Sequence, residues 1–330
     1  MLKISKRLLP FSAVTLSTVL ILNMCIIGNT TQVTANDDNY DITEKINVAL
    51  SRSLAWLEGS QNSNGSWGNA DIINDTCYSI STLSDNGYDV ATGVQWLSTV
   101  SLNDNVDTLS RKLYATHTEN SYAKSLIGMQ NADGGFGVDK NYRSEVYDTV
   151  LAFEAFATLD TSAYDSNTQK MLSYLADSQN DDGSFSCSQY NDAEETLTAR
   201  IVYDTMQYLN SKSLNSSKLL SMVSSAQTYL SSTTVTNFDM EENQIEGSLY
   251  YALFKQAKGD YTEVYDIVKK ITDSQQENGS FYNSVYDTCL VIKYLNALDT
   301  VEESYNVDSL TVTLDNDSVF TDNAQTVVGD

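Results

Sequence analysis

One pattern recurs four times along the chain: a Gln, a polar turn that contains Gly, and then an aromatic residue. The four copies are SQNSNGSW (60–67), MQNADGGF (129–136), SQNDDGSF (178–185) and SQQENGSF (274–281). Each copy follows an apolar pattern with helical spacing and precedes an acidic residue at the head of a second helix. Such repeats are typical of chains in which each unit buries its apolar face against the next unit.

The acidic residues divide the chain into six helical hairpins at intervals of 32 to 51 residues. The first helix of a hairpin is amphipathic, as the spacing of Ile46, Leu50, Leu54 and Leu57 indicates. The second is apolar on most faces, as in TVLAFEAFATL, and is therefore expected to be buried. The acids at the heads of the second helices are Asp75, Asp107, Asp148, Glu195, Glu246 and Asp287, of which the second and fifth mark weaker copies.

The first and last repeats match the pattern as well as the middle ones do. An open stack of repeats needs polar capping repeats at its ends, and none is evident here. Ring closure is therefore favoured, which predicts an all-α (α/α)6 toroid of six helical hairpins, with parallel inner helices and all six acids at one rim. Asp75-Thr76-Cys77 and Asp287-Thr288-Cys289 would then lie side by side.

The repeated Gln, Gly turn and aromatic, followed by an acid-headed apolar helix, resembles the QW-type repeat of squalene and oxidosqualene cyclases and of protein prenyltransferase β subunits. The resemblance covers residues 43–300 and implies an alpha-alpha toroid; we take the chain as a secreted bacterial member whose activity stays open. It also implies that the Gln and aromatic residues clamp each turn to a neighbouring helix. The expected structural residues are Gln61, Trp67, Gln130, Phe136, Gln179, Phe185, Gln275 and Phe281.

The same resemblance suggests a zinc site, because prenyltransferases hold zinc with Asp-x-Cys on one inner helix and a His on another. Asp75 with Cys77, and Asp287 with Cys289, match the first part. The only histidine, His117, lies about 15 Å further along its helix than the acids, at 1.5 Å rise per residue. We therefore favour no metal and no cofactor, with zinc as the alternative. A disulfide between the two cysteines is a further alternative to simple packing.

The acids have two interpretations. As N-caps they would accept hydrogen bonds from the first turns of the inner helices, which is the plain structural role. As groups at the cavity mouth they would bind a ligand. Cyclase chemistry is disfavoured because no Asp-x-Asp-Asp motif is present, although aromatic residues on the inner helices (Phe153, Phe156 and Tyr294 among them) could stabilise a cation. The expected ligand-binding residues are Asp75, Asp107, Asp148, Glu195, Glu246, Asp287, Tyr78, Tyr203 and Tyr251.

The N-terminal residues 1–35 have the basic start, apolar stretch and small-residue cleavage pattern of a secretory signal peptide. We expect cleavage after Ala35 and a protein that is secreted or attached to the cell surface. Cleavage would leave a net charge of −28, because the whole chain carries −25 and the leader holds three basic residues and no acidic one. Nucleic acid is thereby disfavoured as a partner.

Three domains are expected: the signal peptide (1–35), the toroid (36–305) and a β-rich tail (306–330). In the tail Leu310, Val312 and Leu314 alternate with polar residues, which predicts a strand. The tail is either a small hairpin on the toroid or the start of an immunoglobulin-like module.

For function we favour a ligand-binding or scaffold module for a small molecule, glycan or peptide. The alternatives are a cyclase or prenyltransferase-like enzyme, or a glycan-active enzyme that uses two carboxylates at the mouth. Complement-like thioester chemistry is discarded, since the Gly-Cys-x-Glu-Gln signature is absent.

Overall fold

The computed structural model describes residues 38–100, 105–118, 121–188, 191–232, 261–298, 309–314 and 318–323, together with residues 246, 249–250 and 252–253. The chain forms two compact units, residues 1–297 and residues 298–330. The expected signal peptide lies outside the described residues. In the described part of the chain, no helix is long and apolar enough to cross a membrane.

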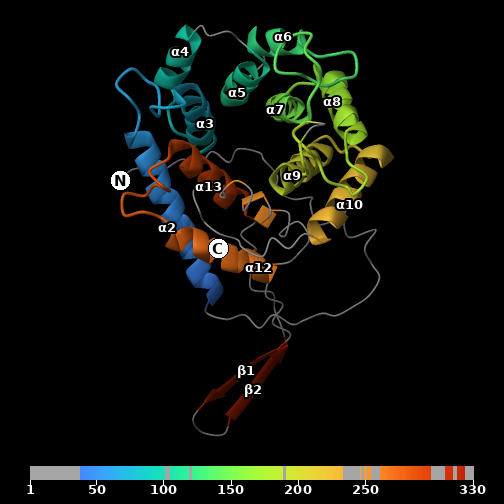
Figure 1. Ribbon diagram of the computed structural model, residues 1–330. Helices are drawn as coiled ribbons and strands as arrows, with labels where there is room; N and C mark the ends of the chain where they lie inside the picture. Colours follow the sequence, from blue (N-terminus) through green and yellow to red (C-terminus); the bar gives the residue numbers. More distant parts are fainter. Residues whose placement is uncertain are drawn as a thin grey trace. The chain divides into compact units, whose positions relative to one another are not determined.

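The first unit consists of helices that alternate between an outer and an inner layer (Figure 1). The outer helices are α2 (Asp38–Gly59), α4 (Ala91–Thr99), α6 (Ser121–Ile127), α8 (Asp165–Asp177), α10 (Ser217–Ser232) and α12 (Tyr261–Asp273). The inner helices are α3 (Ile72–Asp85), α5 (Val106–Thr116), α7 (Val146–Ala157), α9 (Glu195–Ser211) and α13 (Val285–Ala297). The second helix of the fifth hairpin is represented by Glu246 and residues 249–250 and 252–253.

The ring closes where the last hairpin meets the first. Helix α13 packs against α3 and α2, and α12 packs against α2. At this seam the Ser79 hydroxyl lies 3.9 Å from the Cys289 sulfur, although the two residues are 210 positions apart. Neighbouring inner helices also pack on one another, α3 on α5, α5 on α7 and α7 on α9. The predicted alpha-alpha toroid is confirmed.

The repeated glutamines tie each turn to itself and, in three copies, to the next outer helix. Gln130 donates to the Gly134 and Asn167 carbonyls, and Gln179 donates to the Gly183 and Met222 carbonyls. The four aromatic residues of the motif are almost fully buried beneath these turns. These contacts make the motif part of the framework that joins one hairpin to the next.

The last copy joins the two ends of the chain in the same way. Gln275 donates to Gly279 O at 3.0 Å, Ala49 O at 2.9 Å and Ser53 Oγ at 2.8 Å, and the last two acceptors lie on α2. Arg52 adds hydrogen bonds to the Gln276 and Glu277 carbonyls at 2.9 Å each. Ring closure therefore reuses the contact that joins consecutive repeats.

A threonine in the first turn of the inner helix completes each motif. The backbone N–H of the aromatic residue donates to a threonine hydroxyl at 2.9 to 3.0 Å in all four copies, namely Trp67 to Thr76, Phe136 to Thr149, Phe185 to Thr198 and Phe281 to Thr288. The residue before this threonine is Asp75 in the first copy, Asp148 in the second, Leu197 in the third and Asp287 in the fourth. The assignment of Glu195 to this position was therefore wrong by two residues.

The N-cap role expected for the acids is also wrong for the helices whose caps are defined. The N-cap residues of α3, α7 and α9 are Asp71, Glu145 and Glu194, and none of their side chains makes a capping hydrogen bond. Helix α5 is capped by Asn105, which accepts from the Thr108 N–H. The predicted acids lie inside the first turn instead, where the positive end of the helix dipole still favours a carboxylate.

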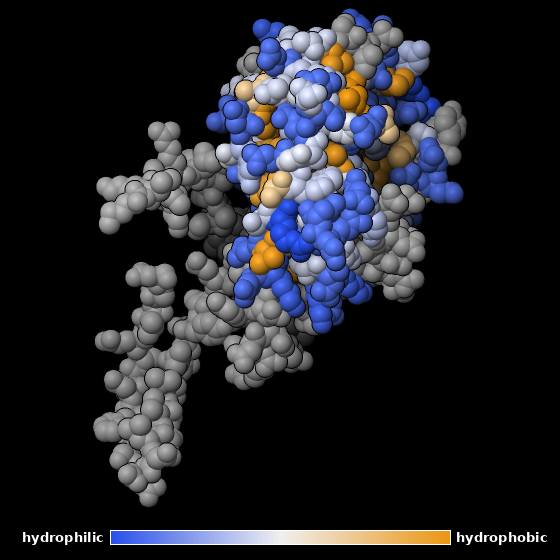
Figure 2. Space-filling view, turned by 90° about the vertical axis from the view of Figure 1, so that its left-hand side faces the viewer, coloured by the Kyte–Doolittle hydropathy of each residue, from blue (hydrophilic) through white to orange (hydrophobic). Residues whose placement is uncertain are grey.

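The surface of the helical unit is largely hydrophilic, as expected for so acidic a chain. Figure 2 shows one face, on which apolar residues are scattered among polar ones. In the second unit, β1 (Ser309–Leu314) pairs antiparallel with β2 (Ser318–Asn323), with Val312 opposite Phe320. The β-type tail is thus a two-stranded hairpin, and its assignment to a larger module stays a prediction.

Candidate functional site

The inner helices carry charged and tyrosine side chains that meet one another inside the ring. Arg200 on α9 makes a two-pronged ion pair with Glu154 on α7, with Nε–Oε1 at 2.5 Å and Nη2–Oε2 at 2.6 Å. Its Nη1 atom also pairs with Glu246 Oε1 at 2.9 Å. Tyr286 on α13 donates from its hydroxyl to Glu246 Oε2 at 3.1 Å.

The contacts continue around the ring through aromatic side chains. Tyr286 stacks edge-on against Tyr78 of α3, with 4.8 Å between ring centroids. The guanidinium carbon of Arg111 on α5 lies 6.0 Å from the centroid of Tyr78. Each of the six hairpins thereby contributes one residue to a continuous series. We call this series the lumen belt: Glu154, Arg200, Glu246, Tyr286, Tyr78 and Arg111.

The charged side chains of the belt are largely buried, where a charge without a partner would be unfavourable. The side chains of Arg200 and Glu154 are 5% and 10% exposed, so each charge depends on its partner for stabilisation. Burial alone would raise the pKa of Glu154, but the charge and hydrogen bonds of Arg200 outweigh it and hold that pKa at about 2. Burial raises the pKa of the adjacent Asp204 well above its usual value, and the negative charge of Glu154 adds to the effect. Glu154 is therefore ionised, whereas Asp204 favours the protonated form.

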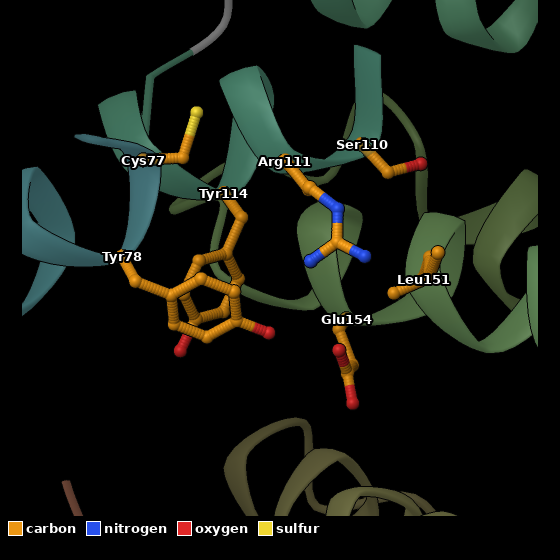
Figure 3. A pocket seen from close by; sticks show the side chains of 7 residues that line it. All are labelled: Cys77, Tyr78, Ser110, Arg111, Tyr114, Leu151 and Glu154. Carbon is orange, nitrogen blue, oxygen red and sulfur yellow. The ribbon is translucent and has the colours of Figure 1, made fainter. Parts of the chain in front are cut away.

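A pocket opens beside the belt between α3, α5 and α7 (Figure 3). Its empty volume is about 260 Å³, including space open to solvent. Figure 3 shows the guanidinium of Arg111 between the two tyrosine rings and Leu151, on the side that faces Glu154. The lining residues are Cys77, Tyr78, Ser110, Arg111, Tyr114, Leu151 and Glu154.

Two polar atoms near the pocket lack hydrogen-bond partners among the described residues. They are Ser110 Oγ, in the pocket wall, and Asp204 Oδ2, beside Glu154. Two hydrogen bonds hold the Arg111 guanidinium in place: Nε donates to Asp107 Oδ1 at 2.8 Å, and Nη1 donates to Asn74 Oδ1 at 2.5 Å. Buried polar groups without partners are rare in proteins and mark places where a ligand or water can complete the hydrogen bonding.

Cations of the protein itself occupy the faces of several tyrosines. Lys293 Nζ lies 5.5 Å from the ring centroid of Tyr114 and 5.8 Å from that of Tyr250. The guanidinium carbon of Arg200 lies 5.8 Å from the Tyr250 centroid. These rings already serve as cation–π partners, which limits what they can offer to a positively charged reaction intermediate.

The acids predicted at the mouth do not form one cluster. Asp148 is buried and Asp75 is partly buried, and burial, followed by neighbouring acids, raises the pKa of each to about 6. Asp287 is among the acids that act on Asp75, so these two lie near each other as expected. Glu195 is exposed on the surface.

The other predicted residues are divided between the wall and the belt. Asp107 supports Arg111 through an ion pair, and Glu246 alone among the six acids belongs to the belt. Tyr78 lines the pocket, and Tyr203 lies 6.1 Å from Tyr250 between ring centroids. Tyr251 lies outside the described residues.

The candidate zinc residues lie near the seam of the ring. Cys77 and Cys289 are buried free thiols, so the alternative of a disulfide between them is wrong. Burial raises the pKa of each thiol to about 12, so both are protonated at neutral pH when no metal is bound. Across the residues that the structure describes, no three His, Cys, Asp or Glu side chains gather in a way that could hold a metal.

Comparison with known proteins agrees with this architecture. Residues 94–241 match the family model described as the prenyltransferase alpha-alpha toroid domain. The prenyltransferase-like alpha-alpha toroid predicted from the repeats is thus confirmed, and no curated protein matches the chain.

Several solved structures resemble the chain at low sequence identity. A protein from Actinoplanes is 12% identical, with a TM-score of 0.55 over 76% of this chain and 99% of that one. A type II terpene cyclase from Scytonema in its apo form is 12% identical, with a TM-score of 0.39 over 77% of this chain and 99% of that one. Alpha-2-macroglobulin from E. coli is 15% identical, with a TM-score of 0.40 over 83% of this chain and 18% of that one. The first of these supports the fold, and the other two likenesses are too distant to support more.

Glu246 and Tyr78 of the belt were predicted from the sequence, whereas its other four residues were missed, although a signal exists. Glu154, Arg200 and Lys293 each interrupt an apolar inner helix, as in TVLAFEAFATL and TCLVIKYLNAL. A charged residue in a helix expected to be buried must find a partner or a functional role. That rule would have singled out these residues without identifying their partners.

Proposed function

We propose that this protein is a secreted or cell-surface module that holds a small polar molecule, a glycan unit or a peptide end in the lumen of its toroid. The observation that carries the proposal is the lumen belt. Replacing a buried ion-pair network by apolar residues is often neutral or stabilising, so stability alone is a weak reason to keep one. A ligand that needs fixed donors and acceptors is a better reason, and Ser110 Oγ and Asp204 Oδ2 offer unused hydrogen-bonding capacity.

The character of the lumen argues against an isoprenoid substrate. Cyclisation of an isoprenoid passes through carbocations, which need apolar, electron-rich walls. Here Arg111, Arg200 and Lys293 place positive charges at the tyrosine faces, and a carbocation beside them would be repelled. The sequence also lacks the Asp-x-Asp-Asp motif. These points favour a polar ligand over the cyclase and prenyltransferase alternatives.

The test is a thermal-shift and native mass spectrometry screen of residues 36–330. The panel holds neutral and acidic oligosaccharides, short peptides, amino acids and geranylgeranyl diphosphate. A ligand at 100 times its Kd adds about 2.7 kcal/mol to the stability of the folded state. We expect stabilisation by one polar class and none by the isoprenoid.

Two variants locate the binding. Ser110→Val removes the unpartnered hydroxyl in the pocket wall and should reduce affinity by about tenfold, the cost of one hydrogen bond. Thr228→Val changes an exposed hydroxyl on α10 and should leave affinity unchanged. Stabilisation by geranylgeranyl diphosphate alone, or polar binding that Ser110→Val and Arg111→Met both leave intact, would overturn the proposal. Release of shorter glycans during the screen would support the glycan-active alternative instead.

A further inference from the structure

The residues of the pocket between α3, α5 and α7 differ in how far solvent reaches them. The side chains of Arg111 and Glu154 are 16% and 10% exposed, and Tyr78 and Tyr114 are also partly exposed. Leu151, in contrast, is buried in the pocket wall. A molecule that enters the pocket therefore meets the two charged groups and the two tyrosines directly.

Arg111 presents unused hydrogen-bond donors to the pocket. A guanidinium has five N–H donors, and among the described residues Arg111 donates from Nε to Asp107 and from Nη1 to Asn74. Nη2 has no acceptor there, and Figure 3 shows the Nη atoms pointing toward the side of the pocket where Glu154 lies. Because two hydrogen bonds already fix the group, little freedom is lost when Nη2 binds an acceptor. A carboxylate is the acceptor that suits a guanidinium best.

Glu154 carries the opposite charge on the other side of the same pocket. Arg200 takes two of the about four acceptor positions of the Glu154 carboxylate, and Asp204 takes a further one. Within the described part of the chain, Glu154 and Arg111 do not pair with each other. The pocket thus separates a positive group with unused donors from a negative group that can still accept a hydrogen bond.

A ligand with one kind of charge suits only half of this pocket. An anion that binds Arg111 would be repelled by Glu154, and a cation that binds Glu154 would be repelled by Arg111. A neutral sugar would leave both charges without a matching group. A molecule with a carboxylate and an ammonium group on the same carbon can meet both at once, and the free α-amino acids have this structure.

The size and the remaining wall of the pocket restrict the ligand further. Its empty volume of about 260 Å³ includes space open to solvent. Pockets for drug-sized ligands usually measure roughly 300–1,000 Å³, so the occupant is smaller than these ligands. The rest of the wall includes Leu151 and the rings of Tyr78 and Tyr114, which suit a small aliphatic side chain.

We propose that the pocket binds a free α-amino acid with a small aliphatic side chain, whose carboxylate lies at Arg111 and whose ammonium group lies at Glu154. This inference names the ligand class of the site proposed above and therefore rests on that proposed function. Leu151 and the two tyrosine rings contact the aliphatic side chain. The ion pair between Glu154 and Arg200 stays in place when the ligand binds, and it orients the Glu154 carboxylate.

The experiment is isothermal titration calorimetry of residues 36–330, which include every described residue, with L-alanine, L-valine and L-leucine. We expect at least one of the three to bind. The carboxamide and the N-acetyl derivative of that amino acid each lack one of the two charged groups. Each derivative should bind about 10- to 100-fold more weakly, which is the contribution of one charge-assisted hydrogen bond. Glucose serves as the neutral polar comparison.

Arg111→Met tests the assignment of the carboxylate, because it removes the guanidinium and keeps an apolar stem. It should weaken binding of the amino acid by about 10- to 100-fold and leave the weaker binding of the carboxamide unchanged, as expected when the two groups interact directly. Lys170→Met removes an exposed positive charge on α8 and is the matched control. It should leave both affinities unchanged.

Equal affinity for the amino acid and for either derivative would overturn the proposal. So would a folded Arg111→Met variant that weakens binding of the carboxamide as much as binding of the amino acid. The comparison of derivatives uses the unmodified protein, so it decides the question even if the variant does not fold. If glucose or another polar ligand binds and the three amino acids do not, this inference is wrong and the proposed function stands. If no polar ligand binds, both are wrong.

Discussion

The Gln275 side chain joins the last repeat to the first, and its removal tests how the ring is closed. In Gln275→Ala the amide Nε2 no longer donates to Gly279 O, Ala49 O and Ser53 Oγ. Gln61, at the same position in the first motif, donates to a single acceptor, Gly65 O, at 3.0 Å among the described residues. The two glutamines therefore form a matched pair that differs in the contacts to a second hairpin.

The expected cost follows from the number of hydrogen bonds lost. A typical hydrogen bond contributes about 0.5–1.5 kcal/mol net, and an amide has two hydrogens to share among its acceptors. Gln275→Ala should thus lower the free energy of unfolding by about 1–3 kcal/mol, and Gln61→Ala by about 0.5–1.5 kcal/mol. The difference is the contribution of the contacts from Gln275 to α2.

Urea unfolding of residues 36–330, followed by far-ultraviolet circular dichroism, measures both values under one set of conditions. Native-state hydrogen exchange adds a local readout, since Gln275→Ala should increase exchange in α2 and α12 more than in α7. If Gln61→Ala proves as costly as Gln275→Ala, or if exchange increases uniformly, the inferred role of this clamp in ring closure is wrong.

Three further predictions concern the belt and the rim. Arg200→Met leaves the buried Glu154 carboxylate uncompensated and should lower the free energy of unfolding by about 3–5 kcal/mol in urea titrations. Asp75 has a folded-state pKa of about 6, above its ordinary value of 3.8, so the folded state binds more protons and its stability falls as pH rises from about 4 to 6. Asp75→Asn should remove that slope and stabilise the protein at pH 7.5 by no more than about 1 kcal/mol, because solvent screens a partly exposed carboxylate. Gly68→Ala places a Cβ 1.8 Å from Asp75 Oδ2 at a φ of +72° and should lower the melting temperature more than Gly87→Ala, whose Cβ would meet open space at a φ of +80°.

The repeated turns and helices could largely be predicted from the sequence, because the contacts that define them join residues close together in the chain. Each Gln closes a turn onto a carbonyl four residues away, so the motif appears as a short string wherever the contact exists. The error at Glu195 has a local cause too. The segment EETLTAR offers an acid followed by threonine at Glu195, but the hydroxyl that reaches the Phe185 N–H belongs to Thr198. Only the fold shows which threonine lies under the aromatic residue.

The belt could not be derived in the same way, because its partners come from different repeats. Arg200 is 46 residues from each of its partners, Glu154 and Glu246, and pairs with both only because the ring brings three inner helices together. Ser81 and His117 are 36 residues apart and meet at the ends of adjacent helices. Sequence periodicity identifies which helix face is buried, whereas the opposing side chain depends on ring diameter and helix rotation.

The contacts that hold the repeats together and the residues that line the lumen are separate. Lumen residues of such a toroid can therefore change without loss of the fold. The clamps at the turns use Gln, Gly, an aromatic residue and Thr, and they make their bonds largely to backbone atoms. The inner faces of α7 and α9 take no part in those clamps, so residues such as Glu154 and Arg200 can change together as a pair without disturbing them. A single change is far more costly, since it leaves one buried charge alone. Function in this fold is therefore better inferred from the paired residues of the lumen than from the repeats that mark the family.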